Sequence, residues 1–280
     1  MLAMRFTRLK LTGIAGGIAL ALASATSYAA PQDEQSAVVD FSGYWQRNDQ
    51  PFMQFLPPPN GQGPLREHPV QKRSAGDNKP FIGDWKDPLL QPGAAQVIKD
   101  KAYRQIVDRE EILPAHSLCW PAGVPGALRL REPMQFLQEL NLITIIYQRD
   151  HTTRRILLNQ REHTKNLKPS WYGESIGYYD GDTLVVDTIG VDDRSTVDWY
   201  GTPHTTEIHV IERYRMVDNG QRLQVTFTVD DPKTFTKPWT AIVNYRRMAQ
   251  QFDEIVCAEN NKNASTGQDY PVPTAAKADF

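Results

Sequence analysis

The sequence is poor in cysteine, with two in 280 residues, and has no basic excess, because 33 Asp and Glu outnumber 31 Lys and Arg. A surface that binds a phosphate backbone needs such an excess, so we expect no nucleic-acid partner. The G-x-G-x-x-G and G-x-x-x-x-G-K-[ST] loops are also missing, which argues against a nucleotide cofactor. Its 40% hydrophobic and 23% charged residues are close to the average of globular proteins. We expect a globular protein without a cofactor.

An apolar run at residues 11–23 follows Arg5, Arg8 and Lys10 and precedes Ser27-Tyr28-Ala29. A positive start, a short apolar core and small residues before the cleavage point are typical of a secretory signal. We therefore predict a signal peptide over residues 1–29 and a periplasmic or secreted mature protein without a membrane span. An N-terminal membrane anchor is the alternative, although the run is short for a bilayer.

The two cysteines are Cys119 and Cys257, both after the predicted signal. In an oxidising compartment an even pair is most simply a disulfide, which would close a loop of about 138 residues and stabilise the fold by a few kcal/mol. Two buried thiols are the alternative. Neither cysteine belongs to a C-x-x-C pair, so no redox motif is present.

Nine of the twenty prolines fall between residues 51 and 92, where they exclude a central strand or a long helix. We interpret residues 30–92 as a first strand followed by an extended strap packed on the domain. After it, Ala94, Ile98, Ala102 and Ile106 recur every four residues, which predicts a helix from Ala94 to about Ile112. The helix and the strands that follow would form one unit over residues 93–260, with a loose tail at 261–280. The aromatic residues expected to anchor the strap are Phe52, Phe55, Phe81 and Trp85.

From residue 140 onward the pattern is that of short strands joined by tight turns such as Asp180-Gly181-Asp182. Many hairpins and a single helix predict a mainly β protein, specifically an antiparallel β-barrel of lipocalin or calycin type with one helix and the N-terminal Pro-rich strap. The strands expected are Val38–Trp45, Leu140–Gln148, Arg154–Asn159, Ser175–Tyr179, Thr183–Thr188, Glu207–Met216, Arg222–Val229, Thr240–Arg247 and Phe252–Cys257.

Residues 173–177 match G-x-S-x-G, the motif that presents the serine nucleophile of α/β-hydrolases. Asp187 and His204 follow Ser175 in the order of that triad. The motif here leads into a hairpin instead of a helix, and the spacings to Asp187 and His204 are short for that fold. A serine hydrolase using Ser175 is therefore a second alternative, beside the structural interpretation in which the two glycines let a strand bend.

A second group of polar residues surrounds the expected strand that begins at Glu207. On a strand Glu207 and His209 would share a face, with His204 just ahead of them. Two histidines and a carboxylate can hold a non-haem metal, but this spacing matches no known metal motif, so we expect none. Without a metal, His204 would act as general base or acid oriented by Glu207, with His151 and Arg155 stabilising negative charge. Each of these residues could instead be a surface or core residue.

Aromatic side chains make up 10% of the chain and gather near these polar residues. They predict the walls of a pocket for a small apolar or aromatic molecule, although core packing is an equal alternative. On a strand, Glu212 would share a face with the apolar Ile208 and Tyr214 and point into the barrel. A carboxyl buried there is a general-acid candidate. The residues expected to bind substrate are Tyr147, Trp171, Tyr179, Glu212 and Trp239.

Gly43-Tyr44-Trp45 resembles the G-x-W that opens lipocalin-type barrels, where the Trp closes one barrel end against a late Arg. That resemblance implies the same role here for Arg246 or Arg247.

A broader resemblance is carried by the stretches 119–125, 171–190, 203–204, 210–214 and 230–232, which look like a family of exported bacterial proteins, most of them described only as hypothetical. It covers most of residues 40–260 and implies export and a single domain, but no chemistry.

These observations together favour an exported small-molecule enzyme, a cofactor-independent lyase or isomerase that uses acid/base groups in a barrel pocket. The alternative is a non-catalytic periplasmic carrier for an apolar ligand. The oligomeric state does not follow from the sequence.

Overall fold

The computed structural model describes residues 38–48, 54–69, 81–110, 112, 119–149, 152–249 and 253–255. The predicted signal peptide, the tail at 261–280, His151 and Cys257 lie outside these residues. The disulfide between Cys119 and Cys257 and any role of His151 therefore stay predictions. None of the helices within the described ranges is long and apolar enough to cross a membrane.

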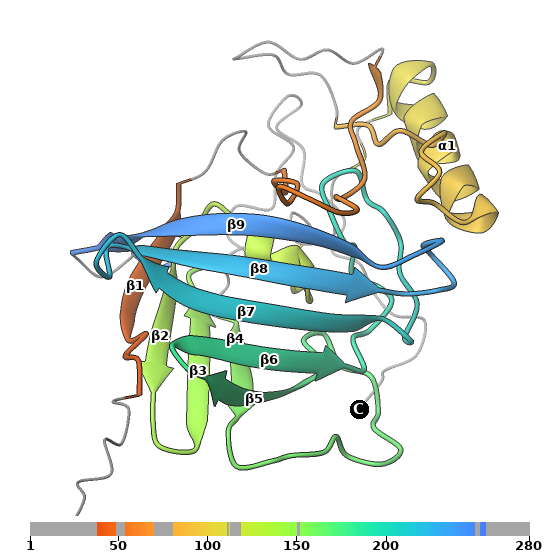
Figure 1. Cartoon of the computed structure of the whole chain (residues 1–280). Helices are drawn as coiled ribbons and strands as arrows, with labels where there is room; N and C mark the ends of the chain where they lie inside the picture. Colours follow the sequence, from red (N-terminus) through yellow and green to blue (C-terminus); the bar gives the residue numbers. More distant parts are fainter. Residues whose placement is uncertain are drawn as a thin grey trace, which may run out of the picture. The chain divides into compact units, whose positions relative to one another are not determined.

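Within the described residues, nine strands form a closed barrel in sequence order, β1 to β9, with one α-helix outside it (Figure 1). The predicted mainly β barrel with one helix is confirmed. The elements are β1 Gly43–Arg47, α1 Pro92–Ile106, β2 Met134–Gln138, β3 Leu142–Tyr147, β4 Thr153–Leu157, β5 Glu174–Asp180, β6 Thr183–Ile189, β7 His209–Val217, β8 Arg222–Asp230 and β9 Trp239–Met248, with a short 3₁₀ helix at Gly126–Arg129.

The pairing departs from the predicted antiparallel barrel at one place. Strands β4 and β5 are parallel, and only Ile156↔Ser175 and Leu157↔Ile176 are paired between them. The long connection over residues 158–173 returns the chain to the same end of the barrel, which a tight hairpin cannot do. As a result, β4 and β5 both begin at one end and finish at the other.

Two predicted elements differ from the structure, and one strand was not predicted. The predicted last strand, Phe252–Cys257, is not a strand in residues 253–255, where Ile255 makes a single bridge to Arg149. The barrel closes instead through β1 against β9, and β2 was not predicted. Helix α1 ends at Ile106 instead of Ile112, because Arg109 takes a left-handed φ of 55° and the Glu110 N–H donates to the Arg104 carbonyl (3.0 Å).

On most strands alternate residues fill the core of the barrel, as period-two patterning predicts, whereas β5 and β6 each bury three successive residues. On β8, for example, Leu223, Val225, Phe227 and Val229 are buried. The strap closes one opening: its Phe55 ring lies 4.8 Å from Phe227, and the Leu56 N–H donates to the Ile242 carbonyl on β9 (3.2 Å).

The G-x-W at β1 has a clear structural basis. Trp45 is fully buried, and its indole N–H donates to the Phe41 carbonyl (2.9 Å). The guanidinium of Arg247 on β9 stacks over the Trp45 ring at 4.2 Å and donates to the Ser42 carbonyl. Gly43 has a φ of +117°, and a Cβ there would lie 2.9 Å from Arg247. Glycine is therefore needed both for the backbone conformation and for the approach of the arginine.

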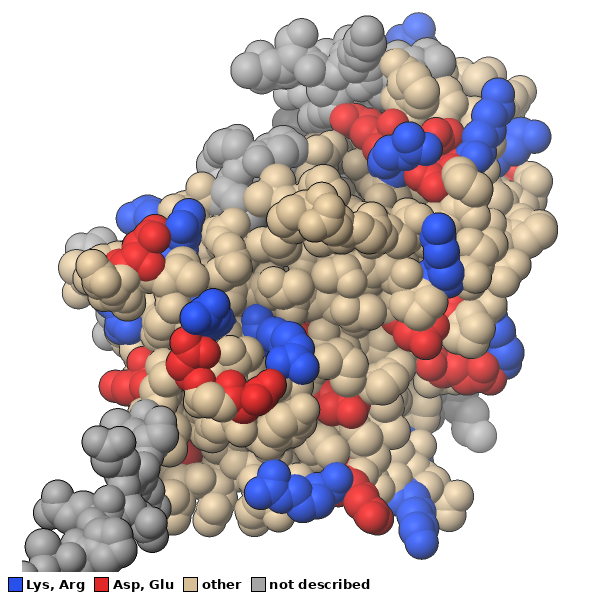
Figure 2. All heavy atoms as spheres, viewed as in Figure 1, with Lys and Arg blue, Asp and Glu red and all other residues tan. Residues whose placement is uncertain are grey.

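Basic and acidic side chains are interspersed over the face of the molecule shown in Figure 2, with no continuous basic stripe on that face.

Candidate functional site

A cavity of about 490 Å³ opens where β4 and β5 begin, lined by side chains from residues 153–157 and 167–175. We call it the arginine pocket. It exists because the parallel strands meet only from Ile156 and Ser175 onward and diverge before that point. Gly173, at a φ of +63°, turns the chain into β5, and a Cβ there would collide with the Ile189 carbonyl. The pocket thus follows from the parallel pairing and from one glycine.

Arg154 is one of the residues that line the arginine pocket, and its guanidinium is buried in the barrel, because the residue is 2% exposed. Its Nη1 and Nη2 donate to the two oxygens of Glu212 on β7, the first at 2.9 Å. Nη2 also donates to Thr188 Oγ1 on β6 (2.7 Å), and Nε donates to Ser175 Oγ on β5 (3.0 Å). Burial lowers the pKa of Arg154, but the charge of Glu212 outweighs it and the net pKa is raised. Arg154 is a fixed cation joined to three other strands.

Two tyrosines complete this buried polar group. The Tyr214 hydroxyl donates to Glu212 Oε1 (2.7 Å). Tyr147 is 2% exposed, and its hydroxyl interacts with the Arg154 guanidinium. Its ring stacks on Tyr172 at 5.6 Å, and Tyr172 lines the pocket. Glu212 points into the barrel as alternation predicts, but it is the partner of a guanidinium and not an isolated carboxyl in an apolar interior.

Trp171, which forms one wall of the pocket, is contacted by two other side chains. The Arg194 guanidinium lies 4.4 Å from the Trp171 ring, and the Trp120 ring lies 5.3 Å from it on a neighbouring segment. Arg194 is itself paired with Asp192 through two hydrogen bonds of 2.8 Å. Trp171 therefore presents a pre-oriented aromatic surface, which lowers the entropy cost of binding a flat molecule.

The rim carries one cation and one carboxylate, Arg155 and Glu174. Arg155 is exposed because it alternates with the inward-facing Arg154 and Ile156. Glu174 accepts hydrogen bonds from the Thr164 N–H (2.8 Å), the Thr164 hydroxyl (2.6 Å) and His163 (3.0 Å). Burial raises the pKa of Glu174, but these hydrogen bonds outweigh it and the net pKa is lowered. The carboxylate therefore stays ionised, which makes it a weak general base.

Behind Glu174, a chain of hydrogen bonds follows the outer face of the barrel. His163 Nε2 lies 3.0 Å from Asp187 Oδ1, and His209 Nε2 lies 2.8 Å from the same oxygen. Burial raises the pKa of Asp187, but the hydrogen bonds from the two histidines leave it lowered. No group of His, Cys, Asp and Glu within the described residues has the arrangement of a metal site.

His209 supplies a pH prediction. The hydrogen bond to Asp187 raises the pKa of His209 above 6.5, so this pair stabilises the fold fully below that value. As the pH rises through the raised pKa, the proton and the stabilisation are lost. We expect the difference in unfolding free energy between the wild type and His209→Gln to become smaller between about pH 6 and about pH 9. The decrease should be measurable but no larger than about 1 kcal/mol, because the pair is partly exposed. Urea denaturation measures it, and a difference that stays constant with pH would contradict the pairing.

The predicted His204–Glu207 pair is not formed. Burial lowers the pKa of His204, whose Nε2 lies 2.8 Å from Ser195 Oγ and whose Nδ1 lies 3.0 Å from the Thr205 carbonyl. Glu207 is exposed and forms an ion pair with Lys233. The prediction that Glu207 and His209 share a strand face is wrong, because β7 begins at His209 and Glu207 lies in the preceding turn.

The Ser175 triad is not formed either. Ser175 faces inward and is bonded to Arg154 and Thr188, whereas Asp187 lies on the outer face of β6. The motif has a structural explanation: Gly173 forms the turn, and a Cβ at position 177 would lie 2.8 Å from Ile156. The two glycines therefore let the chain turn into β5 and let β4 pack against it.

The remaining predicted site residues lie in different places. Arg155 and Trp171 line the arginine pocket, and Tyr147 and Glu212 lie directly behind it. Trp239 packs in the core against Phe227 and Phe235. Tyr179 lines a different cavity.

Glu174 also lines the pocket and was not predicted as a site residue. Alternation around Ile156 would have placed Arg154 inside the barrel, but nothing local identifies its partners. Comparison with models of protein families and with curated proteins finds no match for this chain.

Proposed function

We propose that this protein is an exported binding protein for a small aromatic molecule with an acidic group, which it holds in the arginine pocket. The observation that carries the proposal is a cavity of ligand size with the exposed guanidinium of Arg155 at its rim and the ring of Trp171 as its wall. Arginine suits a carboxylate because its planar fork can donate two parallel hydrogen bonds. The aromatic side chain suits a flat apolar body.

Binding is favoured over the acid/base lyase or isomerase because, among the residues that the structure describes, none that lines the pocket is placed to transfer a proton. Glu174 is the carboxylate at the rim, and its lowered pKa favours the ionised form. His204 is bonded to Ser195, and Glu207 is paired with Lys233. The described groups of the pocket, chiefly Arg155 and Trp171, can bind a charged group and pack against a flat body, which is what a carrier requires.

Export and a lipocalin-type barrel belong to the same proposal. The Arg247–Trp45 stack at the closure of β1 on β9 supports the lipocalin analogy, because it reproduces the pairing that the G-x-W resemblance implies. The signal-like sequence of residues 1–29 supports export.

Two substitutions test the pocket. We expect Arg155→Gln to weaken binding of naphthoate about 10-fold and to leave binding of naphthylmethanol unchanged, because only the acid interacts with the guanidinium. Trp171→Ala should weaken both ligands by a similar factor, because it removes the shared aromatic contact. Fluorescence titration gives the dissociation constants, and Arg213→Gln, an exposed arginine paired with Asp180, is the matched control. Equal affinity of wild type and Arg155→Gln for naphthoate would refute the proposal.

A further inference from the structure

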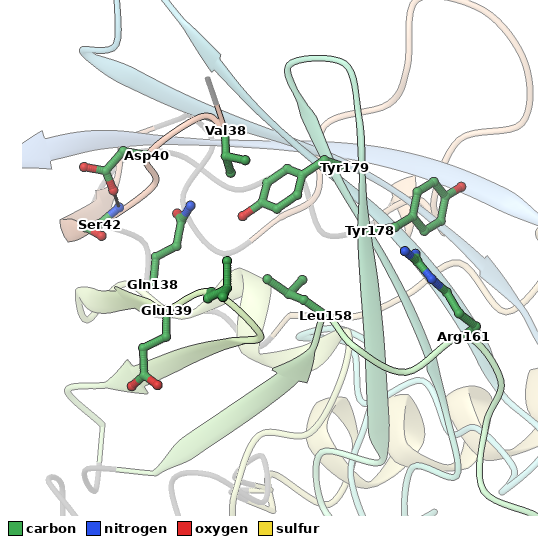
Figure 3. Close-up of a pocket in the computed structure, with 10 residues that line it drawn as sticks. Val38, Asp40, Ser42, Gln138, Glu139, Leu158, Arg161, Tyr178 and Tyr179 are labelled. Atoms are coloured by element: carbon green, nitrogen blue, oxygen red, sulfur yellow. Dashed lines mark hydrogen bonds between the residues drawn. The ribbon is translucent and has the colours of Figure 1, made fainter. Parts of the chain in front are cut away.

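A second cavity, of about 810 Å³, lies where β4 and β5 finish (Figure 3). Because these strands are parallel, it lies at the opposite end of the strand pair from the arginine pocket. We call it the mouth pocket. Its walls come from residues 38–42 ahead of β1, residues 138–140 between β2 and β3, Leu158 and Arg161 after β4, and Tyr178 and Tyr179 at the end of β5.

The mouth pocket has an exposed apolar rim. Leu140 is 91% exposed, Val38 is 59% exposed and Tyr178 is 45% exposed. Leu137, on the neighbouring β2, is exposed as well. Large apolar side chains that gather around a cavity of ligand size mark a binding site more often than single exposed residues do.

One polar atom of this cavity has no partner. The Tyr179 hydroxyl oxygen is buried and makes no hydrogen bond to the described residues. In Figure 3 the hydroxyl of Tyr179 points toward Gln138 across the cavity. The amide of Gln138 is already used, because its oxygen accepts from the Phe41 N–H and its nitrogen donates to the Val39 carbonyl, both at 2.9 Å. A bound molecule with an N–H group would satisfy the tyrosine oxygen.

The charges at this rim favour a cation. Asp40 and Glu139 lie on the β1 and β2 side of the cavity, whereas Arg161 lies on the other side, near Tyr178 (Figure 3). Asp40 is held ionised by hydrogen bonds from Ser42, which lower its pKa. The charge of Arg247 also lowers the pKa of Asp40. The Arg247 side chain is held away from the cavity, because it is stacked on Trp45 and bonded to the Ser42 carbonyl. Two acidic residues therefore line one side of the cavity, and one arginine lines the other.

We infer that the mouth pocket binds a small organic cation, an amine with an apolar or aromatic body. The ammonium group lies between Asp40 and the hydroxyl of Tyr179, where it donates to both oxygens. The body packs on Leu158 and Leu140. The two ends of the β4–β5 pair thus carry sites of opposite charge preference.

Three probes with the same phenyl body test this inference on the full-length mature chain: phenethylamine, phenethyl alcohol and phenylpropionate. Chemical-shift titration of the amides at 138–140 and 178–179 reports the mouth pocket, whereas the amides at 170–175 report the arginine pocket. Failure at one cavity is therefore distinguishable from failure at the other. We expect the amine to bind the mouth pocket about 5-fold more tightly than the carboxylate at low salt, with a smaller difference at physiological salt because the rim is exposed.

Charge variants decide the sign. Asp40→Asn should weaken the amine about 3-fold at low salt without changing the affinity for the alcohol, because the amide oxygen keeps the bond to Ser42 and loses only the charge. Arg161→Gln should raise the affinity for the amine about 2-fold, because it removes the positive charge on the other side of the cavity. Asp182→Asn, an exposed carboxylate outside the cavity, is the control. Tighter binding of the carboxylate, equal binding of all three probes, no binding, or an Asp40→Asn variant with unchanged amine affinity would each overturn the inference.

Discussion

Glu212→Leu and Arg154→Leu are each expected to lower the free energy of unfolding by about 3–5 kcal/mol. The reason is the burial of both partners, since Arg154 is 2% exposed and Glu212 is fully buried. Removing either one leaves the other as an unpaired charge inside the barrel and also breaks hydrogen bonds to Ser175, Thr188 or Tyr214. Such a loss is a large part of the about 5–15 kcal/mol of a typical domain.

The double variant, with leucine at both positions, is the diagnostic measurement. It removes both charges, so we expect it to be more stable than either single variant, and urea denaturation of all four proteins gives the coupling free energy. The exposed pair Arg213–Asp180 is the matched control, and its coupling should lie below about 1 kcal/mol. If the double variant loses as much stability as the two single losses added together, Arg154 and Glu212 do not interact in the way described.

Trp45→Ala is expected to lower the free energy of unfolding by about 3–5 kcal/mol, the cost typical of deleting a fully buried tryptophan. One part of this loss comes from the cavity left in the core. The other part comes from the lost contacts of Trp45 with Arg247 and with the Phe41 carbonyl. Trp45 lies on β1, which pairs with β9 to complete the barrel, and Arg247 of β9 stacks on its ring. The indole also bonds to the Phe41 carbonyl at the entry to β1.

Tyr103→Ala on α1 removes an aromatic ring of which 60% is exposed, so it is the control for Trp45→Ala and should change stability by less than about 0.5 kcal/mol. Arg247→Gln should lower the free energy of unfolding by about 1–2 kcal/mol, a value between those of the two other variants, because it removes the stacked cation and leaves the indole in place. Chemical denaturation followed by circular dichroism compares the three. A Trp45→Ala variant as stable as Tyr103→Ala would contradict the role assigned to the G-x-W.

The G-x-S-x-G motif shows how far a local pattern can be interpreted. Its serine suggested a nucleophile, but both glycines serve the backbone: Gly173 forms a turn with positive φ, and Gly177 lets β4 pack against β5. A motif of five residues specifies a local conformation and no more. Whether Ser175 faces a histidine or an arginine depends on strands that are distant in the sequence.

The prediction of the site failed for a similar reason. His204 and Glu207 were paired on the assumption that Glu207 belongs to a strand, but β7 begins at His209. Alternation holds only inside a strand, so an error of two residues at the boundary removes the argument. Arg155 and Trp171, in contrast, were predicted as site residues and both line the arginine pocket.

The sequence by itself determined the barrel class and most of the hairpins, because period-two alternation and turn residues act over a few positions. Only the tertiary structure decided that β4 and β5 run parallel and that Arg154 reaches Glu212, 58 residues further along the chain. Strand direction and barrel closure depend on contacts between distant segments, and the buried charge of Arg154 required a partner that only the closed barrel could supply.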